Sequence, residues 1–166
     1  MRLSVRPAIG DDCEAIASIY NEGIEDRIAT FETRQRSAGD IRSWFNTRYP
    51  LVVVTDDERV IAFASASTYR PRECYDGIAE FSVYVARNDR GRGAGRLAMQ
   101  GLIEAAREAG FWKLLSRVFT ENTASLELLN SLRFREVGVY EKHARLDGRW
   151  RDVVIVERLL DSLTDE

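Results

Sequence analysis

Residues 90–96 combine three glycines with three arginines, between a strand-like run at 78–85 and a helix-like run at 94–109. Glycine lets backbone N–H groups approach a ligand closely, and a helix start presents unpaired N–H groups and the positive end of the helix dipole. Arginine binds phosphate through paired donors. The segment therefore predicts an anion site, typically for phosphate, at the start of the helix. A solvated turn is the alternative interpretation of the glycines alone.

The glycine spacing G-x-G-x-G differs from two common nucleotide motifs. No Gly-Lys-Ser/Thr follows, as a P-loop requires, and the dinucleotide fingerprint has the spacing G-x-G-x-x-G. A carboxylate, Glu80, lies within the preceding strand, ten residues before Arg90. Because a positioned carboxylate can act as a general base, the pattern predicts a catalytic site beside a cofactor site. A glutamate that faces solvent at the strand edge is the alternative.

The composition favours one soluble, cytoplasmic domain. The chain has 166 residues, a hydrophobic fraction of 45%, a net charge of −3 and a sequence pI of about 5.4, which argues against a general nucleic-acid binder. It has no apolar run long enough for a membrane span and no apolar stretch typical of a signal peptide. Cys13, Cys74 and the single His143 fit no metal spacing or disulfide framework, so no metal and a reducing compartment are expected.

Periodicity and capping signals predict the order βααβββαβαββ in one domain at residues 1–160, followed by a polar tail at 161–166. Ser37 and Asn122 are typical helix N-caps, and Gly110 is typical of a helix end. Gly23 is expected to end or bend the first helix. The strands are expected at residues 2–8, 51–55, 60–67, 78–85, 113–118, 134–142 and 152–159.

Three motifs in order resemble the GNAT superfamily of N-acetyltransferases, over almost the whole chain. Residues 90–95 match the acetyl-CoA signature Gln/Arg-x-x-Gly-x-Gly/Ala, residues 80–85 are similar to the superfamily's bulged strand, and Asn122-x-x-Ser125 matches a conserved helix start. The resemblance implies a single α/β domain with a central mixed, mostly antiparallel twisted sheet flanked by helices. It also implies a bulge near Ser82 and Val83, and acetyl-CoA as the co-substrate.

A narrower resemblance is to the phosphinothricin N-acetyltransferases, on the motifs at residues 19–21, 30–31, 80–85 and 148–152. These enzymes acetylate the α-amine of toxic, glutamate-like amino acids, and their relatives act on methionine sulfoximine and arsinothricin. Residues 69–75 and 113–117 are most similar to the arsinothricin branch. The resemblance implies resistance to such an amino acid, and a homodimer whose active sites lie near the interface.

The resemblance also implies roles for individual residues. Glu80 would accept the proton of the amine, directly or through a water, and the N–H of Val83 would polarise the thioester carbonyl. Asn122 would bond the pantetheine arm, or it would serve only as a helix cap. The cofactor-binding set is Val83, Tyr84, Val85, Arg90, Gly91, Arg92, Gly93, Ala94, Gly95, Arg96, Asn122, Ser125 and Ser131.

For the carboxylates of the substrate, Arg70 and Arg72 in an irregular segment are the first candidates, and their alternative role is ordinary surface charge. Phe31 and Tyr75 would form walls of the pocket. His143 is placed on the substrate side or in a structural role ahead of a role as the base.

Two residues depart from the family pattern. Arg133 stands where the family usually has glycine, so a backbone with positive φ is expected there. Leu129 stands where many members have the acid that protonates the departing thiolate, so no dedicated general acid is expected. Two other functions stay open: acetylation of a protein N-terminus or lysine, and an acyl-CoA sensor without catalysis. Glu80 argues against the sensor.

Overall fold

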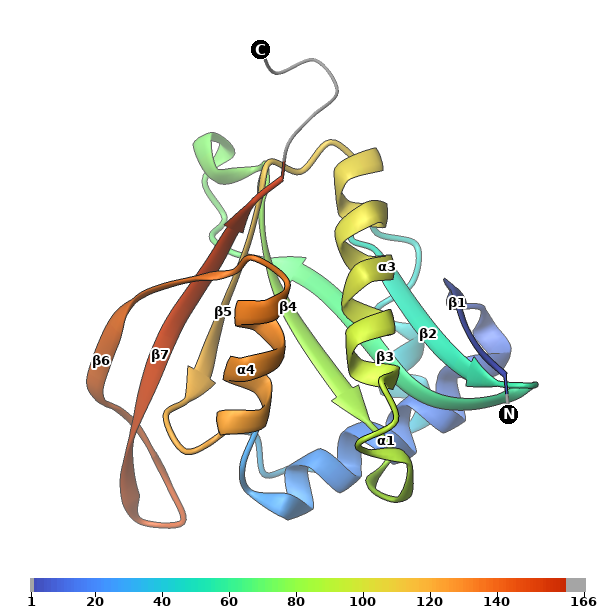
Figure 1. The fold of residues 1–166 in the computed structure, drawn as a ribbon, viewed down its shortest axis with the longest axis horizontal. Coiled ribbons are helices and arrows are strands. Elements are labelled where there is room, and N and C mark those ends of the chain that lie inside the picture. The colour runs from blue at the N-terminus through green and yellow to red at the C-terminus, as the bar shows by residue number, and fades with distance from the viewer. Residues whose placement is uncertain (1, 161–166) are drawn as a thin grey trace.

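The computed structural model describes residues 2–160, so the polar tail predicted at 161–166 lies outside the described residues. Its elements follow the order predicted from the sequence (Figure 1). The strands are β1 (Leu3–Pro7), β2 (Leu51–Asp56), β3 (Arg59–Thr68), β4 (Ile78–Val85), β5 (Lys113–Phe119), β6 (Arg135–Leu146) and β7 (Arg149–Leu159). The helices are α1 (Cys13–Asp26), α2 (Ala38–Arg42), α3 (Ala94–Glu108) and α4 (Thr123–Ser131).

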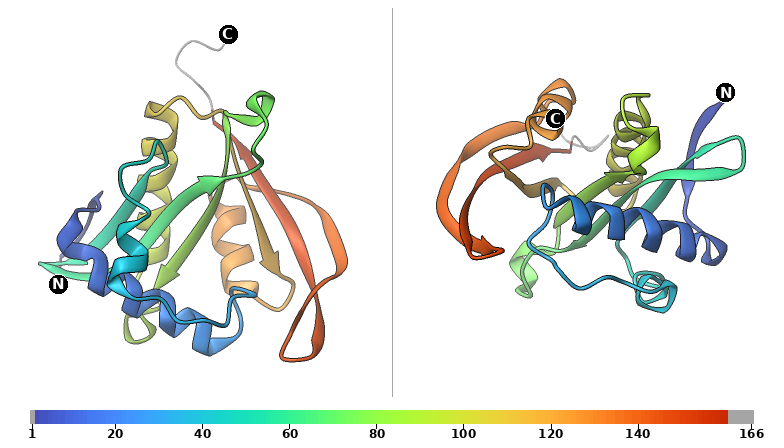
Figure 2. Two further views of the ribbon diagram at one scale, coloured as in Figure 1. Left: turned by 180° about the vertical axis from the view of Figure 1, so that it is seen from behind. Right: turned by 90° about the horizontal axis from the view of Figure 1, so that it is seen from below.

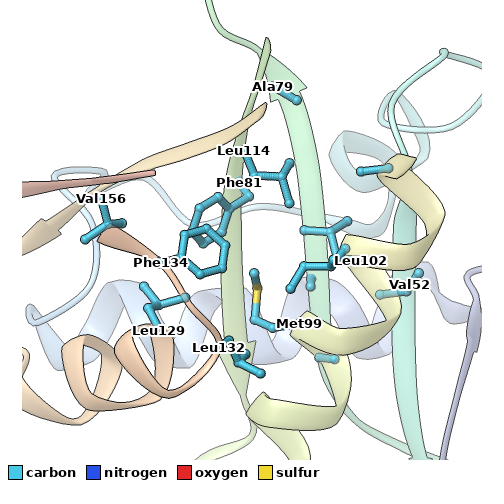
Figure 3. Close-up of a cluster of buried hydrophobic side chains, with 14 of the residues drawn as sticks. Val52, Ala79, Phe81, Met99, Leu102, Leu114, Leu129, Leu132, Phe134 and Val156 are labelled. Atoms are coloured by element: carbon cyan, nitrogen blue, oxygen red, sulfur yellow. The ribbon is translucent and has the colours of Figure 1, made fainter. Parts of the chain in front are cut away.

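The strands form one sheet in the order β1-β2-β3-β4-β5-β7-β6. Helices α3 and α4 cover one face of the sheet, and α1 and α2 cover the other (Figures 1 and 2). Figure 3 shows the larger core, where Met99 and Leu102 of α3 point towards the sheet and Phe81 of β4 lies beside Phe134. Burial of these apolar side chains stabilises the packing of α3 and α4 against β4 and the strands beside it.

Strand β4 has different neighbours along its length. Its antiparallel register with β3 is continuous from Ala79 to Val85, so the bulge expected near Ser82 and Val83 is absent from this described stretch. Its parallel pairing with β5 extends from Ile78 to Glu80 and ends there. The backbone edge of β4 that the sequence attributed to a bulge is therefore freed by the divergence of two strands.

Helix α1 continues through Gly23 to Asp26, so the expectation that Gly23 ends the helix is wrong. A Cβ atom on Gly23 would lie 2.7 Å from Cδ1 and Cε1 of Tyr84 in β4. The glycine is therefore needed for close approach of the helix to the Tyr84 ring. This contact brings the C-terminal end of α1 against the part of β4 that diverges from β5.

Arg133 has a φ of 69°, as its place in the family pattern predicts. The residue follows the end of α4, and its side chain is exposed. A non-glycine residue in this left-handed region brings its Cβ close to the following carbonyl oxygen. The structure thus accepts local strain at the turn from α4 into β6.

Arg133→Gly is expected to raise the free energy of unfolding by roughly 0.5–1 kcal/mol, because relief of the Cβ contact exceeds the entropy that glycine loses. Urea unfolding would measure the change. Arg133→Ala is the control, since it removes the same side chain and keeps the Cβ. Equal stability of the two variants would contradict the assignment of strain to the Cβ.

Candidate active site

The glycine loop before α3 adopts a conformation that suits an anion. Gly91 and Gly93 have φ values of 78° and 87°, and a Cβ on either would meet no other atom within 4 Å. The space beside this backbone is therefore open. Gly93 immediately precedes Ala94, the first residue of α3, so the loop runs directly into a helix N-terminus with its unpaired N–H groups.

A groove of about 430 Å³ passes over this loop. It extends from the end of β4 to the starts of α3 and α4, with the C-terminal part of α1 and the following residues on its other side. All the predicted cofactor residues line it except Arg92 and Ser131. The lining residues are Gly23, Ile28, Ala29, Val83, Tyr84, Val85, Arg90, Gly91, Gly93, Ala94, Gly95, Arg96, Asn122, Ala124, Ser125 and Leu128.

The partly exposed side chain of Arg92 is held by two carboxylates. Its Nη1 donates to Asp89 at 2.6 Å, and its Nη2 donates to Asp56 at 2.8 Å. Arg59 also donates to both carboxylate oxygens of the buried Asp89, each at 3.0 Å. These contacts tie the glycine loop to the β2–β3 hairpin. The expectation that the Arg92 guanidinium faces a phosphate is not supported by this geometry.

Arg90 and Arg96 are placed differently, because both line the groove. Arg90 donates to Asp26 at the end of α1, at 2.8 Å, and about half of its side chain is exposed. Arg96 donates to the Oγ of Ser131 at 2.6 Å. Ser131 is therefore linked to the groove through Arg96, although it does not line the groove itself.

Asn122 is both a helix cap and a residue of the groove. Its Oδ1 accepts from the backbone N–H of Ser125 at 3.3 Å, which confirms the predicted N-cap of α4. Its side chain also borders the open space. The two interpretations of Asn122 are thus compatible, because the amide nitrogen remains available when the oxygen caps the helix.

A small cavity of about 60 Å³ occupies the place where β4 and β5 diverge. A hydrogen bond of 2.9 Å from Ser116 Oγ to the carbonyl of Phe81 joins the two strands at this place. The cavity shares Val83, Tyr84 and Asn122 with the groove. We call this cavity the junction.

A second pocket of about 340 Å³ lies on the other side of the junction and contains Glu80. It shares Phe81, Ser82, Ser116 and Arg117 with the junction. The groove, the junction and this pocket therefore form a continuous series across the sheet. The complete lining is Tyr20, Ala29, Thr30, Phe31, Glu32, Glu80, Phe81, Ser82, Tyr84, Ser116, Arg117, Phe119 and His143.

Glu80 forms an ion pair with Arg117 in the wall of this pocket. Arg117 Nη2 lies 2.7 Å from each carboxylate oxygen, and the exposed fractions of the two side chains are 25% for Glu80 and 42% for Arg117. Glu80 is thus directed into a pocket and not simply into solvent. Sequence reasoning missed Arg117 as its partner. The signal is the parallel register, which pairs Glu80 with Leu115 and places Arg117 on the same face, two residues further on.

Two phenols, those of the partly buried Tyr20 and the buried Tyr84, complete the inner wall. Burial raises the pKa of Tyr20 and of Tyr84, and the rings of the two residues lie 5.1 Å apart, edge to face. Both phenols are therefore neutral at physiological pH. Helix α4 contributes Ser125 and Leu129 to the junction, and neither titrates near neutral pH.

The predicted substrate residues are divided between the pocket and its surroundings. Phe31 lines the pocket and packs against Phe119, with ring centroids 4.7 Å apart. Arg70, Arg72 and Tyr75 are not among the lining residues. Arg70 lies over the Tyr69 ring, 5.1 Å from its centroid.

Three tyrosines lie near the guanidinium of Arg70. Tyr69 is the main cause of the raised pKa of Arg70, with smaller contributions from Tyr75 and Tyr140. The ring of Tyr140 lies 5.3 Å from that of His143, which lines the pocket.

Within residues 2–160, no group of His, Cys, Asp and Glu side chains is arranged to hold a metal ion. None of the helices described there is long and apolar enough to cross a membrane.

Comparison with known proteins identifies the family of this chain. The model of the acetyltransferase (GNAT) family matches residues 16–134. The chain belongs to the GNAT family. It is 32% identical to an L-methionine sulfoximine/L-methionine sulfone acetyltransferase of Pseudomonas aeruginosa, over 97% of this chain and 96% of that protein.

Two solved structures are similar in fold over nearly the whole chain. A ribosomal-protein-alanine N-acetyltransferase from Brucella melitensis has a TM-score of 0.90 and 32% identity, with 95% of this chain and 99% of that chain covered. A phosphinothricin acetyltransferase from Sinorhizobium meliloti, in complex with acetyl-CoA, has a TM-score of 0.90 and 28% identity, with coverages of 100% and 93%.

As a GNAT enzyme, this protein is an acetyltransferase whose donor is acetyl-CoA, which confirms the fold, the activity and the co-substrate expected from the sequence. The groove suits this donor on two grounds. The open space beside Gly91 and Gly93 lets backbone N–H groups approach a pyrophosphate. Arg90 and Arg96 in its wall supply positive charge.

The Asp89 network predicts a pH-dependent contribution to stability. Arg59 and then Arg92 hold the pKa of Asp89 below its usual range. The stabilisation is therefore present at neutral pH and is lost as the pH falls through the folded-state pKa. Asp89→Asn should lower the free energy of unfolding at pH 7 by about 1–2 kcal/mol, since charge-assisted bonds to two arginines weaken.

The difference between Asp89→Asn and the unmodified protein should stay nearly constant from pH 7 to about 5 and should shrink as the pH falls below about 4, in urea unfolding at each pH. Asp147→Asn is the control, because Asp147 is mostly exposed in its pair with Arg27. A pH-independent difference for Asp89→Asn would contradict the electrostatic explanation.

Proposed function

We propose that this protein transfers the acetyl group of acetyl-CoA to the α-amine of a small, glutamate-like amino acid of the phosphinothricin, methionine sulfoximine or arsinothricin type, and so confers resistance to it. The observation that carries the proposal is the pocket of about 340 Å³ with Glu80 in its wall, joined through the junction to the donor groove. The names of the relatives support the same class of acceptor.

The proposed reaction uses the groove, the junction and the acceptor pocket in turn. The α-ammonium of the acceptor loses a proton to Glu80, directly or through a water, and the free amine attacks the thioester carbon at the junction. The N–C bond forms, the C–S bond breaks, and coenzyme A leaves as a thiolate. The N–H of Val83 is proposed to bond the oxyanion that forms between these events. The attacking nitrogen loses its second proton as the amide forms, and this proton passes to the thiolate, because α4 contributes no ionisable side chain to the junction.

The acceptor pocket favours a small molecule over a peptide. It is enclosed by aromatic side chains from separate elements, among them Phe31, Tyr84 and Phe119. We place Arg70 and Arg72, with Tyr75, at the rim as ligands for the distal acid of the substrate. The second candidate function is acetylation of a protein N-terminus, and the observation that favours it is the similarity to the ribosomal-protein-alanine N-acetyltransferase.

We further propose a cytoplasmic homodimer that binds neither nucleic acid nor membrane. The support for a dimer is the β6–β7 hairpin, where large apolar side chains are about half exposed: Val137, Val139, Tyr140 and Trp150. Strand β6 also forms an edge of the sheet, with backbone groups available for pairing. Because His143 of β6 lines the acceptor pocket, such an interface would lie near the active site.

A thiol-release assay with a panel of amines tests the acceptor class. Phosphinothricin, methionine sulfoximine and arsinothricin should have higher kcat/KM values than lysine peptides and peptides with N-terminal alanine, because a pocket of about 340 Å³ suits a compact acid. Competition between an acid and a peptide in one reaction would rank them directly. Turnover of peptides alone would replace the small-molecule function with the protein-acceptor alternative.

Glu80→Gln should lower kcat by roughly 10²-fold or more and spare acetyl-CoA binding, because it removes the base and leaves the donor groove intact. Activity should recover in part at high pH, where free amine is already present. Calorimetry with acetyl-CoA and a pH–rate profile would measure both effects. Glu104→Gln on the exposed side of α3 is the matched control. A variant with the pH–rate profile of the unmodified enzyme would exclude Glu80 as the base.

A further inference from the structure

The acceptor pocket contains one strong cation beside the proposed base. Among the described residues that line the pocket, Arg117 is the only arginine or lysine. The other lining carboxylate, Glu32, is already paired with Arg36 at 3.0 Å. The charges that face an acceptor are therefore the neighbouring Glu80 and Arg117, joined at 2.7 Å.

The geometry of this pair leaves binding capacity unused. A single nitrogen of Arg117, Nη2, donates to both oxygens of Glu80. For Nη1 and Nε of Arg117, the described part of the chain supplies no recorded hydrogen-bond acceptor. A guanidinium has five N–H donors, so Nη1 and Nε of Arg117 leave it the capacity to bond a second carboxylate while Nη2 retains Glu80.

Stability does not explain why the pair is present. With 42% of Arg117 exposed, water screens the attraction, and ion pairs of this kind contribute little to folding. The pair also lies where β4 and β5 stop pairing, at the entrance to the junction. A role in ligand binding accounts for both its position and its exposure.

We propose that Arg117 binds the α-carboxylate of the acceptor while Glu80 receives its α-ammonium. This inference rests on the proposed function and identifies the residue that selects a free amino acid. The two charged groups of an α-amino acid are attached to one carbon, and the two charges of the pocket are in direct contact. Each charge of the zwitterion then meets an opposite charge of the protein, and the pocket gains no net charge.

Amines without a neighbouring carboxylate lack half of this match. A lysine side chain, a peptide N-terminus or an amino-acid amide brings a positive charge next to Arg117, with no anion to offset it. Such an acceptor competes with Arg117 for Glu80. Arg117 therefore selects for the free α-carboxylate, whereas Arg70 and Arg72 at the rim are proposed to contact the distal acid.

The test compares an amino acid that the enzyme acetylates with its α-carboxamide, in the unmodified enzyme and in Arg117→Gln. The unmodified enzyme should favour the free acid in kcat/KM by roughly 10- to 150-fold, the range expected for one charge-assisted contact. Arg117→Gln should remove most of this preference through a higher KM for the acid. Arg117→Lys, which keeps the charge without the fork, should retain an intermediate preference.

Arg135→Gln is the matched control, because Arg135 forms an exposed pair with Glu157 at 2.8 Å outside the pocket, and it should leave the acid-to-amide ratio unchanged. Calorimetry with acetyl-CoA and thermal melts would show that each variant is folded. An unchanged ratio in Arg117→Gln, or a loss of preference in Arg70→Gln instead, would overturn the assignment and leave the proposed function standing. Failure of the unmodified enzyme to acetylate any free amino acid would remove both.

Discussion

The divergence of β4 from β5 is the constraint on which the rest of the site depends. It is the one parallel pairing among the described neighbours of a mostly antiparallel sheet, and it covers three residues on each strand. Beyond Glu80, backbone groups of two adjacent strands lose their partners in the middle of a sheet, which is costly unless other groups satisfy them. The Ser116 hydroxyl satisfies one of them, at Phe81. The other unpaired backbone groups border the junction, where the donor and the acceptor are proposed to meet.

Ion pairs made by acidic side chains hold the segments on either side of this opening in place. Asp26 binds Arg87 and Arg90, which joins the end of α1 to the segment before the glycine loop. Asp89 and Asp56 bind Arg92 on the other side of that loop. An arginine-rich loop is thus neutralised largely by the protein itself. Its backbone N–H groups are left as the principal donors for an incoming anion.

Local signals in the sequence predicted two features of the groove. The glycine-rich turn into the start of α3 and the cap of Asn122 follow from neighbouring residues. Three features could not be predicted in this way: the Arg117–Glu80 pair across 37 residues, the Arg92–Asp56 pair across 36, and the contact of Gly23 with Tyr84. Each depends on the register between elements distant in sequence. The expectation of a bulge in β4 was wrong for the same reason. The divergence of β4 from β5, which depends on the register of distant strands, frees that backbone edge instead.

This difference between the two sides has a functional consequence. The donor groove is built chiefly from backbone and a short motif, so proteins that use acetyl-CoA can share it. The acceptor pocket is built from side chains in separate segments, such as Phe31 after α1, Glu80 in β4, Arg117 in β5 and His143 in β6. None of these four residues lines the groove over the glycine loop. Relatives that are 28–32% identical to this chain can therefore be acetyltransferases like it while they are named for different amines.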